Sequence, residues 1–163
     1  MTDVPEKLLT LRNILKLAHM HFAIFYNDTT ISTVEEGEKL VSNDISKLAP
    51  TLILETEAGF LAAVISGNAR LSYKKIKQQL HLKNVFLASP EKVKQVTGAE
   101  VGQVSLINPS LLTIVDIHLL EKSEVFGGCG VSNYTLSIRP QDLVTINNAR
   151  VFDFTKENLD ICN

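Results

Sequence analysis

Two glycine-bearing loops are the segments of this chain whose residue types could do chemistry. The first, residues 97–105, carries Gly98, Gly102 and Ser105, and the second is the glycine cluster of residues 127–130. Glycine permits a positive φ and lets a ligand approach the main chain closely, so such loops can present backbone N–H groups to a ligand oxygen. The two loops together predict a cleft lined by backbone, and a pair of ordinary surface turns is the alternative.

The cysteine and histidine residues form no motif typical of a metal site or a nucleophile. Cys129 and Cys162 lack the spacing of a zinc site or of a disulfide framework, so neither a metal nor a cofactor is expected. Cys129, inside the glycine cluster, would be reactive only if a positive field lowered its pKa, and packing is the simpler interpretation. His19 and His21 are interpreted as a polar edge before a strand, with a catalytic pair as the alternative.

Four further side chains have both a chemical and a structural interpretation. Asp116 and His118 are interpreted as a strand end that turns into a short helix, with a catalytic dyad as the alternative. Phe25, with its neighbour Tyr26, could line the cleft as a surface on which adenine stacks, and core packing is the alternative.

The composition is that of one globular domain. The chain has 163 residues, of which 45% are hydrophobic and 21% charged, and its formal net charge is −2. This balance gives no whole-molecule attraction to nucleic acid, so no DNA partner is expected, although residues 70–94 form a basic stretch that suits a phosphate-bearing partner or a solvated helix face. We find no signal-peptide pattern and no apolar run of membrane-spanning length, and we expect a soluble, cytoplasmic protein.

Hydrophobic periodicity predicts helices and strands that alternate along the chain. The capping box of Thr33 and Glu36 and the glycine of the turn at Gly59 are the clearest local signals. We predict helices over residues 6–18, 33–48, 72–80 and 89–97 and from Pro140, and strands over 22–26, 51–56, 60–65, 84–88, 112–115, 124–127 and 134–138. The pattern indicates one α/β (α+β) domain with a mixed central β-sheet or partial barrel surrounded by helices, followed by a C-terminal segment, 151–163, that is either docked or frayed.

The order of these elements and loops resembles the YbaK/ProX family, the free-standing relatives of the editing domain of bacterial prolyl-tRNA synthetases. The resemblance treats residues 1–163 as a single domain and is strongest over residues 51–144. The matching positions, in order, are Thr51-Leu52, residues 71–80, Thr97-Gly98, residues 102–105, Val115-Asp116, residues 127–130 and Asp142-Leu143. The ordered set, and no single motif within it, carries the resemblance.

The resemblance implies an aminoacyl-tRNA deacylase that acts in trans on the ester of a mischarged tRNA. Its partner would be the tRNA 3′ end or an aminoacyl-adenosine-like ligand, and main-chain N–H groups can stabilise the developing oxyanion without an ionisable nucleophile. The substrate-binding residues that the resemblance implies are Thr51, Gly102, Gln103, Val104, Ser105, Gly128 and Gly130.

The departures from the family pattern concern the same cleft. Pro50 stands where active members carry a lysine, so the catalytic residue is not identified. Lys47, three residues earlier, is the candidate to take the place of that lysine. Three extended residues span roughly 10 Å, so its long side chain could reach the cleft. Gln103 replaces a glycine of the loop, and Thr135 replaces an aspartate found in some members. The alternative function is therefore a catalytically inactive nucleotide- or oligonucleotide-binding or regulatory module of the same fold, which could act through a protein partner.

Overall fold

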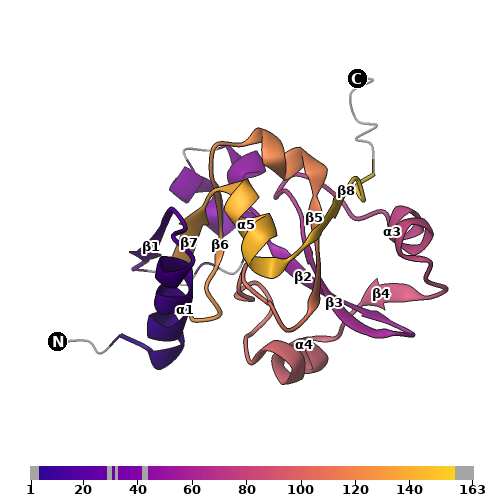
Figure 1. Cartoon of the computed structure of the whole chain (residues 1–163), viewed down its shortest axis with the longest axis horizontal. Helices are drawn as coiled ribbons and strands as arrows, with labels where there is room; N and C mark the ends of the chain where they lie inside the picture. Colours follow the sequence, from indigo (N-terminus) through magenta and orange to yellow (C-terminus); the bar gives the residue numbers. More distant parts are fainter. Residues whose placement is uncertain (1–3, 29–30, 32, 42–43, 157–163) are drawn as a thin grey trace.

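The strands of the chain are divided between two sheets, around which the helices are arranged (Figure 1). The computed structural model describes residues 4–28, 31, 33–41 and 44–156. Its helices and strands are α1 (Glu6–Leu17), β1 (Phe22–Tyr26), α2 (Val34–Gly37), β2 (Thr51–Thr56), β3 (Gly59–Val64), α3 (Tyr73–Leu80), β4 (Val85–Leu87), α4 (Pro90–Thr97), β5 (Leu112–Asp116), β6 (Val125–Gly128), β7 (Tyr134–Ile138), α5 (Pro140–Asn147) and β8 (Arg150–Phe152). Three 3₁₀ turns complete the set: η1 (Glu38–Val41), η2 (Ile45–Lys47) and η3 (Ile117–Glu121).

The larger sheet is mixed and the smaller one is antiparallel. The five-stranded sheet has the order β4-β2-β3-β5-β8, with β3, β5 and β8 parallel and β2 antiparallel to both of its neighbours. The three-stranded sheet has the order β1-β7-β6. Isolated bridges from Leu48 to Phe126 and from Ser105 to Gly128 tie β6 to the segment before β2 and to the glycine loop. The predicted mixed α/β class is confirmed; the strands that the structure describes form two sheets and no closed barrel.

Local capping signals explain where α3 and α4 begin and end. The side chain of Ser89 accepts a hydrogen bond from the N–H of Lys92, Pro90 occupies the first turn, and Gly98 ends α4 with a φ of 77°. Ser72 caps α3 in the same way. The predicted bounds of both helices are confirmed because each end is determined by neighbours in sequence.

The predicted continuous helix over residues 33–48 is wrong. Thr33 does accept a hydrogen bond from the N–H of Glu36, as the capping box predicts, but α2 ends at Gly37 and the chain continues in the separate turns η1 and η2. Glycine is a poor helix former, and the side chain of Asp44 caps the new turn η2 instead of extending a helix. The apolar spacing alone had predicted a longer helix.

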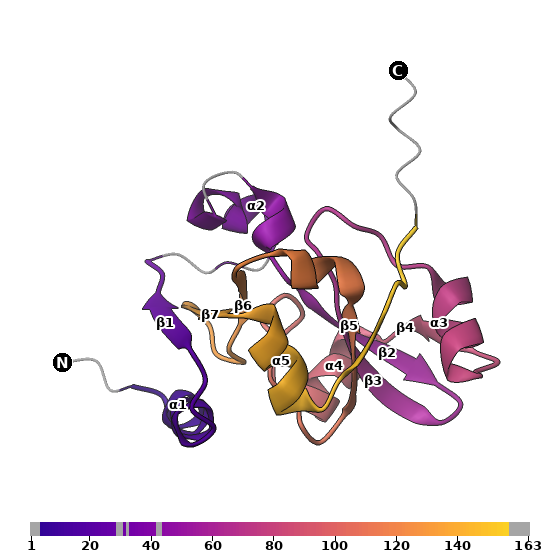
Figure 2. The same ribbon diagram turned by 45° about the horizontal axis from the view of Figure 1, so that its top comes forward.

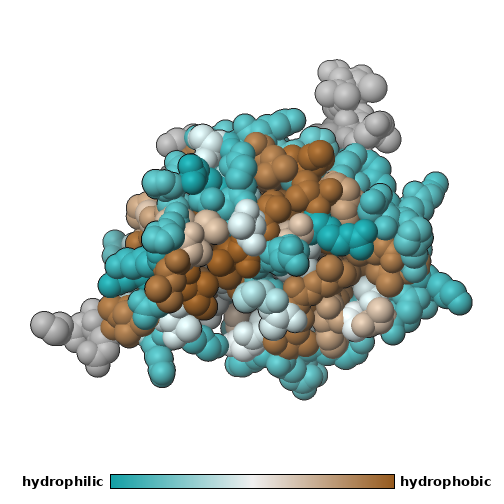
Figure 3. Space-filling model, viewed as in Figure 1, coloured by the Kyte–Doolittle hydropathy of each residue, from teal (hydrophilic) through white to brown (hydrophobic). Residues whose placement is uncertain are grey.

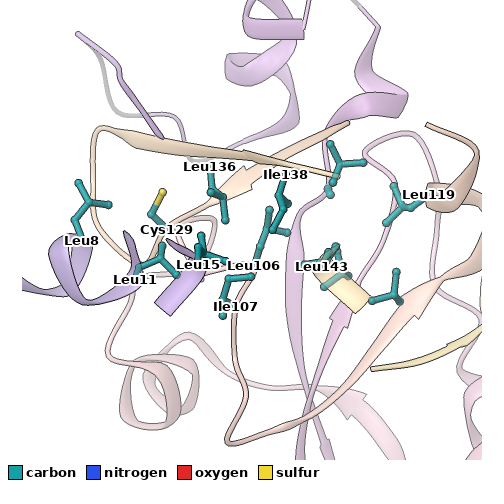
Figure 4. Close-up of a cluster of buried hydrophobic side chains, with 14 residues drawn as sticks. Leu8, Leu11, Leu15, Leu106, Ile107, Leu119, Cys129, Leu136, Ile138 and Leu143 are labelled. Carbon is teal, nitrogen blue, oxygen red and sulfur yellow. The ribbon is translucent and has the colours of Figure 1, made fainter. Parts of the chain in front are cut away.

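The largest cluster of buried side chains lies between α1, α5 and one face of the three-stranded sheet (Figure 4). Leu8, Leu11 and Leu15 of α1 are buried there, as their helical spacing predicts. In the view of Figure 3 apolar side chains also reach the surface between α1 and α5. No helix in the described part of the chain is long and apolar enough to cross a membrane.

Two further clusters pack against the five-stranded sheet. One includes Leu54, Ile76 of α3 and the fully buried Phe154, and the other includes Ile53 and Val93 of α4. Because successive residues of a strand point to opposite faces, Ile53 and Leu54 assign α4 and α3 to opposite faces of this sheet. Phe154 follows β8, so the described beginning of the C-terminal segment is docked; residues 157–163 lie outside the described residues.

The two faces of the three-stranded sheet have different coverings. α1 packs on one face, whereas α2 and its neighbouring turns stand over the other, as Figure 2 shows. The second face is covered less completely, and the candidate site lies there.

Candidate functional site

A cavity of about 320 Å³ opens between α2, the start of β2, the glycine loop before β5 and the second face of the three-stranded sheet. We call this cavity the loop pocket. Its walls are apolar side chains such as Val34, Leu48 and Phe126 together with uncharged polar groups. None of the described residues that line it carries a charge. The pocket therefore suits a neutral ligand group that needs a few hydrogen bonds.

The strand register determines which side chains reach the loop pocket. Phe25 of β1 and Gly128 of β6 both pair with Thr135 of β7, so these three residues share one face of the sheet. Their neighbours Ile24 and Leu136 point to the opposite face, toward α1. Thr135 and Gly128 line the pocket, which identifies the face of Thr135 as the pocket face.

Gly128 is required by the close approach of the glycine loop. A Cβ atom at this position would lie 2.3 Å from the carbonyl oxygen of Val104, which no side chain can accommodate. Leu106 N–H donates to the carbonyl of Gly128 over 3.0 Å, and Gly130 N–H donates to the carbonyl of Gln103 over 3.1 Å. The two glycine-bearing loops are therefore clamped together, and the backbone of the first forms a wall of the pocket.

Thr51 supplies a buried hydroxyl at the edge of the loop pocket. It is the first residue of β2, its exposed fraction is 7%, and it lines the pocket next to Pro50. Its Oγ1 is buried and has no hydrogen-bond partner among the described residues. A hydroxyl can donate one hydrogen bond and accept two, and leaving it unpaired in the interior costs free energy. The hydroxyl is thus available to a ligand.

The structure separates the predicted binding residues into two groups. Ser105 and Gly130 line a second cavity of about 200 Å³, beside α1 on the other side of the loop. Ser105 Oγ accepts a hydrogen bond from the N–H of Ile107 over 3.0 Å, which gives it a role in shaping the loop. The remaining predicted residues line the loop pocket: Thr51, Gly102, Gln103, Val104 and Gly128.

Lys47 lies in η2 and is not among the described residues that line the loop pocket, although Leu48 and Pro50 are. The pKa of Asp44 is lowered, first by the hydrogen bond from the Ser46 hydroxyl and further by the charges of Lys122 and Lys47. The Lys47 ammonium therefore has an acidic neighbour on its own turn.

Sequence reasoning singled out Thr135 but missed Asn27 and Asn133, which complete a polar wall of the pocket. Asn27 Nδ2 donates to Thr135 Oγ1 over 2.8 Å, and Asn133 Nδ2 donates to the carbonyl of Asn27 over 3.1 Å. All three side chains come from the ends of β1 and β7, which pair with each other over a separation of more than a hundred residues. Only the positive φ of Asn133, 69°, had a local signal, because asparagine favours this conformation in turns.

Asp116 and His118 lie outside the loop pocket, where the strand end turns into η3 as predicted. One oxygen of the buried Asp116 carboxylate lies 2.8 Å from His118 Nδ1, and this hydrogen bond raises the pKa of the histidine above its usual value. Asp153 lies beside them, and ligand atoms of the three residues are within 4.8 Å of one another, so they form the group that could hold a metal ion. Lys75 already pairs with Asp153 at 2.8 Å.

The remaining candidate side chains have structural roles. Cys129 is buried among the leucines of α1 (Figure 4), and burial raises the pKa of its thiol to about 12, so it is no nucleophile at neutral pH. The packing interpretation of Cys129 is confirmed, while Cys162 lies outside the described residues. His19 and His21 are exposed in the turn between α1 and β1.

Comparison with known proteins identifies the family. Residues 28–146 match the model of the aminoacyl-tRNA editing domain. The chain belongs to the aminoacyl-tRNA editing domain family. This membership confirms the resemblance to YbaK-type editing domains, and the matched region includes every described residue that lines the loop pocket except Asn27.

Relatives of this editing domain occur both as short chains and within a longer enzyme. The protein YwhH of Bacillus subtilis is 27% identical over 140 residues, which are 83% of this chain and 83% of that protein. A proline–tRNA ligase of Caldicellulosiruptor bescii is 25% identical over 125 residues, which are 77% of this chain and 21% of the ligase. The shared region is thus about a fifth of the ligase.

Solved structures show the same fold. The crystal structure of the protein APE2540 has a TM-score of 0.84 and 30% sequence identity, and the match covers 93% of this chain and all (100%) of that one. A candidate trans-editing enzyme for prolyl-tRNA synthetase has a TM-score of 0.82 at 21% identity, with 95% of this editing domain and 100% of that chain covered. The likeness at 21% identity supports the fold.

Proposed function

We propose that this editing domain is an aminoacyl-tRNA deacylase that hydrolyses, in trans, the ester between a neutral amino acid and the 3′-terminal ribose of a mischarged tRNA. The observation that carries the proposal is the buried hydroxyl of Thr51, which has no partner among the described residues. It lies in a pocket whose described lining is uncharged and whose opposite wall is the backbone of the glycine loop. Family membership and the likeness to a candidate trans-editing enzyme support the same activity.

The lining of the loop pocket favours an uncharged aminoacyl group. A charged side chain would lose its hydration there without meeting an opposite charge among the described lining residues. A cavity of about 320 Å³ has the size of a small ligand site, so it can hold an aminoacyl group together with part of the ribose.

The reaction needs water at the ester carbonyl and donors for the oxyanion that develops there. Gln103 N–H already donates to the carbonyl of Glu100 over 3.0 Å, so we assign the oxyanion to the N–H groups of Gly102 and Val104. Thr51 Oγ1 would donate to a substrate oxygen. Water adds to the carbonyl carbon, the bond to the ribose oxygen breaks, and the neighbouring ribose hydroxyl relays the proton from the water to the departing oxygen. This route requires no lysine at the position of Pro50.

Deacylation assays test the proposal directly. The purified protein is incubated with tRNA specific for proline that carries alanine or cysteine, and with other neutral and charged amino acids on their tRNAs. We expect release of a neutral amino acid well above the rate in buffer, and slower release of lysine or aspartate. Lys47→Ala serves as a control and should retain activity, because Lys47 is not among the described lining residues.

Two outcomes would contradict the proposal. If no aminoacyl-tRNA in the panel is hydrolysed faster than in buffer, the deacylase activity is excluded. If uncharged tRNA or an aminoacyl-adenosine analogue nevertheless raises the melting temperature, the domain is a binding module. Loss of hydrolysis in Lys47→Ala would return the catalytic role to that lysine.

A further inference from the structure

Phe25 is an exposed aromatic residue on the pocket face of the three-stranded sheet. Its exposed fraction is 41%, and it belongs to β1, the edge strand of the sheet. It pairs in register with Thr135, which lines the loop pocket. Paired residues on one face have Cβ atoms about 5 Å apart, so the ring of Phe25 stands directly beside the pocket rim.

The apolar surface of the pocket continues outward to Phe25. The ring of Phe25 packs against Phe126 with centroids 6.4 Å apart and ring planes inclined by 33°, and Phe126 lines the pocket. An exposed aromatic ring at the rim of a hydrophobic pocket has a free surface for a flat ligand group.

We propose that Phe25 is the surface on which the 3′-terminal nucleobase of the tRNA stacks while its ester occupies the loop pocket. This inference rests on the proposed function, because the ester and the terminal base are attached to the same ribose. If the ester lies beside Thr135, the base lies about the width of one ribose away from it. Phe25 pairs with Thr135 across the two strands and is separated from it by a similar distance. Base stacking on aromatic side chains is the general mode of binding to single-stranded RNA ends.

Other described features fit this role less well. Tyr26 is more exposed, at 64%, and packs edge-on at 5.4 Å against Tyr134, which also lines the loop pocket. The register nevertheless assigns Tyr26 to the face of Ile24 and Leu136, away from Thr135. Both side chains are exposed and contact a pocket residue, so the face of the sheet is what favours Phe25.

The basic stretch of residues 70–94 is also a weaker candidate for contact with the RNA end. Its lysines are partly neutralised, since Lys92 pairs with Glu55 at 2.8 Å and Lys94 with Glu100 at 2.7 Å. The helix α3 within it packs against the five-stranded sheet and contributes no residue to the described lining of the loop pocket.

Tryptophan fluorescence offers a direct test, because the natural chain contains no tryptophan. Phe25→Trp introduces a single reporter at the proposed contact. An RNA hairpin with a single-stranded 3′ CCA end should quench its emission, and the same hairpin with an abasic 3′-terminal residue should not. Phe86→Trp is the matched control, since Phe86 is 51% exposed on β4, the edge strand of the other sheet; its emission should not respond.

Kinetics of the full chain provide the second test. Phe25→Ala should raise KM for an aminoacylated hairpin about 5- to 150-fold, the range of one base–aromatic stack, and should leave kcat nearly unchanged. Phe25→Tyr should restore KM, and Phe86→Ala should match the wild type. Hydrolysis of an aminoacyl ester of ribose, which keeps the neighbouring hydroxyl but lacks a nucleobase, should be equal in all four proteins.

The inference is overturned if the abasic hairpin quenches Phe25→Trp as strongly as the natural one, or if Phe25→Ala leaves KM unchanged. Its failure is distinguishable from that of the proposed function. Base-dependent quenching without any hydrolysis would support the stacking role and exclude the deacylase activity. Hydrolysis without base-dependent quenching would support the deacylase activity and exclude the stacking role. If Phe25→Ala has a lowered melting temperature, the comparison of Phe25→Trp and Phe25→Tyr with wild type decides the matter.

Discussion

Thr51 and Asp116 are both buried at the same end of the five-stranded sheet, and each has a side-chain oxygen without a hydrogen-bond partner among the described residues. Thr51 pairs with Val64 and Val64 with Val115, so Thr51 is level with the residue that precedes Asp116 on β5. Only Thr51 borders the loop pocket. The other oxygen of Asp116 bonds the backbone and ring of His118, so its charge already has a partner.

The Thr51 hydroxyl is therefore interpreted as a ligand-binding group and the Asp116 carboxylate as a group that stabilises the fold. The Thr51 hydroxyl makes no hydrogen bond to another described residue, whereas Asp116 caps η3 and anchors its first turn. We therefore expect substitutions at Thr51 to change activity and substitutions at Asp116 to change stability.

The largest expected effect is on activity at Thr51. Thr51→Val keeps the shape of the side chain and removes the hydroxyl, and kcat/KM for deacylation should fall about 10- to 100-fold through loss of a hydrogen bond to the substrate. The free energy of unfolding should change by less than about 1 kcal/mol, because the hydroxyl has no partner among the described residues. Single-turnover deacylation and urea unfolding measure the two quantities, and Thr51→Ser should retain most of the activity. An unchanged kcat/KM in Thr51→Val would contradict the assignment of a substrate-binding role to Thr51 and a structural role to Asp116.

The second expected effect is on stability at Asp116. Asp116→Ala should lower the free energy of unfolding by about 2 kcal/mol, because η3 loses its cap and His118 its acceptor. In a domain of this size the melting temperature should fall by about 4–8 °C. Asp116→Asn keeps an acceptor for the backbone N–H and should lose less. A large loss of kcat in folded Asp116→Ala, with normal stability, would contradict the structural role.

A smaller effect concerns pH and His118. The hydrogen bond to Asp116 raises the pKa of His118, so its stabilisation is fully present below the unfolded pKa of about 6.5 and is lost as pH rises through the higher folded value. Because the side chain of His118 is 51% exposed, we expect less than about 1 kcal/mol. Urea unfolding between pH 5 and 9 should show this decline in the wild type and not in His118→Gln. A difference between the two proteins that grows with rising pH would contradict the sign.

The smallest effect is expected at the neighbouring pair of Lys75 and Asp153. The hydrogen bond from Lys75 is the largest cause that lowers the pKa of Asp153, to about 2, so the stabilisation is present above the unfolded pKa and is lost as pH falls toward 2. Both side chains are partly exposed, at 38% and 44%, and Lys75→Met should cost only a few tenths of a kcal/mol at pH 7. Thermal unfolding from pH 7 to pH 2 measures whether the two proteins converge in acid; a constant difference would exclude the ion pair as its cause.

Features that depend on neighbours in the sequence were predictable. The caps Ser72 and Ser89, the stop at Gly98 and the hairpin turn at Gly59 each act within a few residues, and the corresponding elements have the predicted positions. The helix over residues 33–48 failed for a local reason as well, because the interruption at Gly37 outweighed the apolar spacing.

The amino-acid sequence by itself determined the order and type of most elements, apart from the segment 33–48 and β8, together with the glycines that let two loops approach each other and the position of a threonine at the start of β2. Only the tertiary structure decided which of these groups share the loop pocket. Ser105 and Val104 are adjacent in the chain, yet they line different cavities, because the loop is clamped against Gly128 and its two sides face opposite directions. Asn27 and Thr135 meet through strand pairing between distant segments, and the size and charge of a pocket depend on such non-local packing.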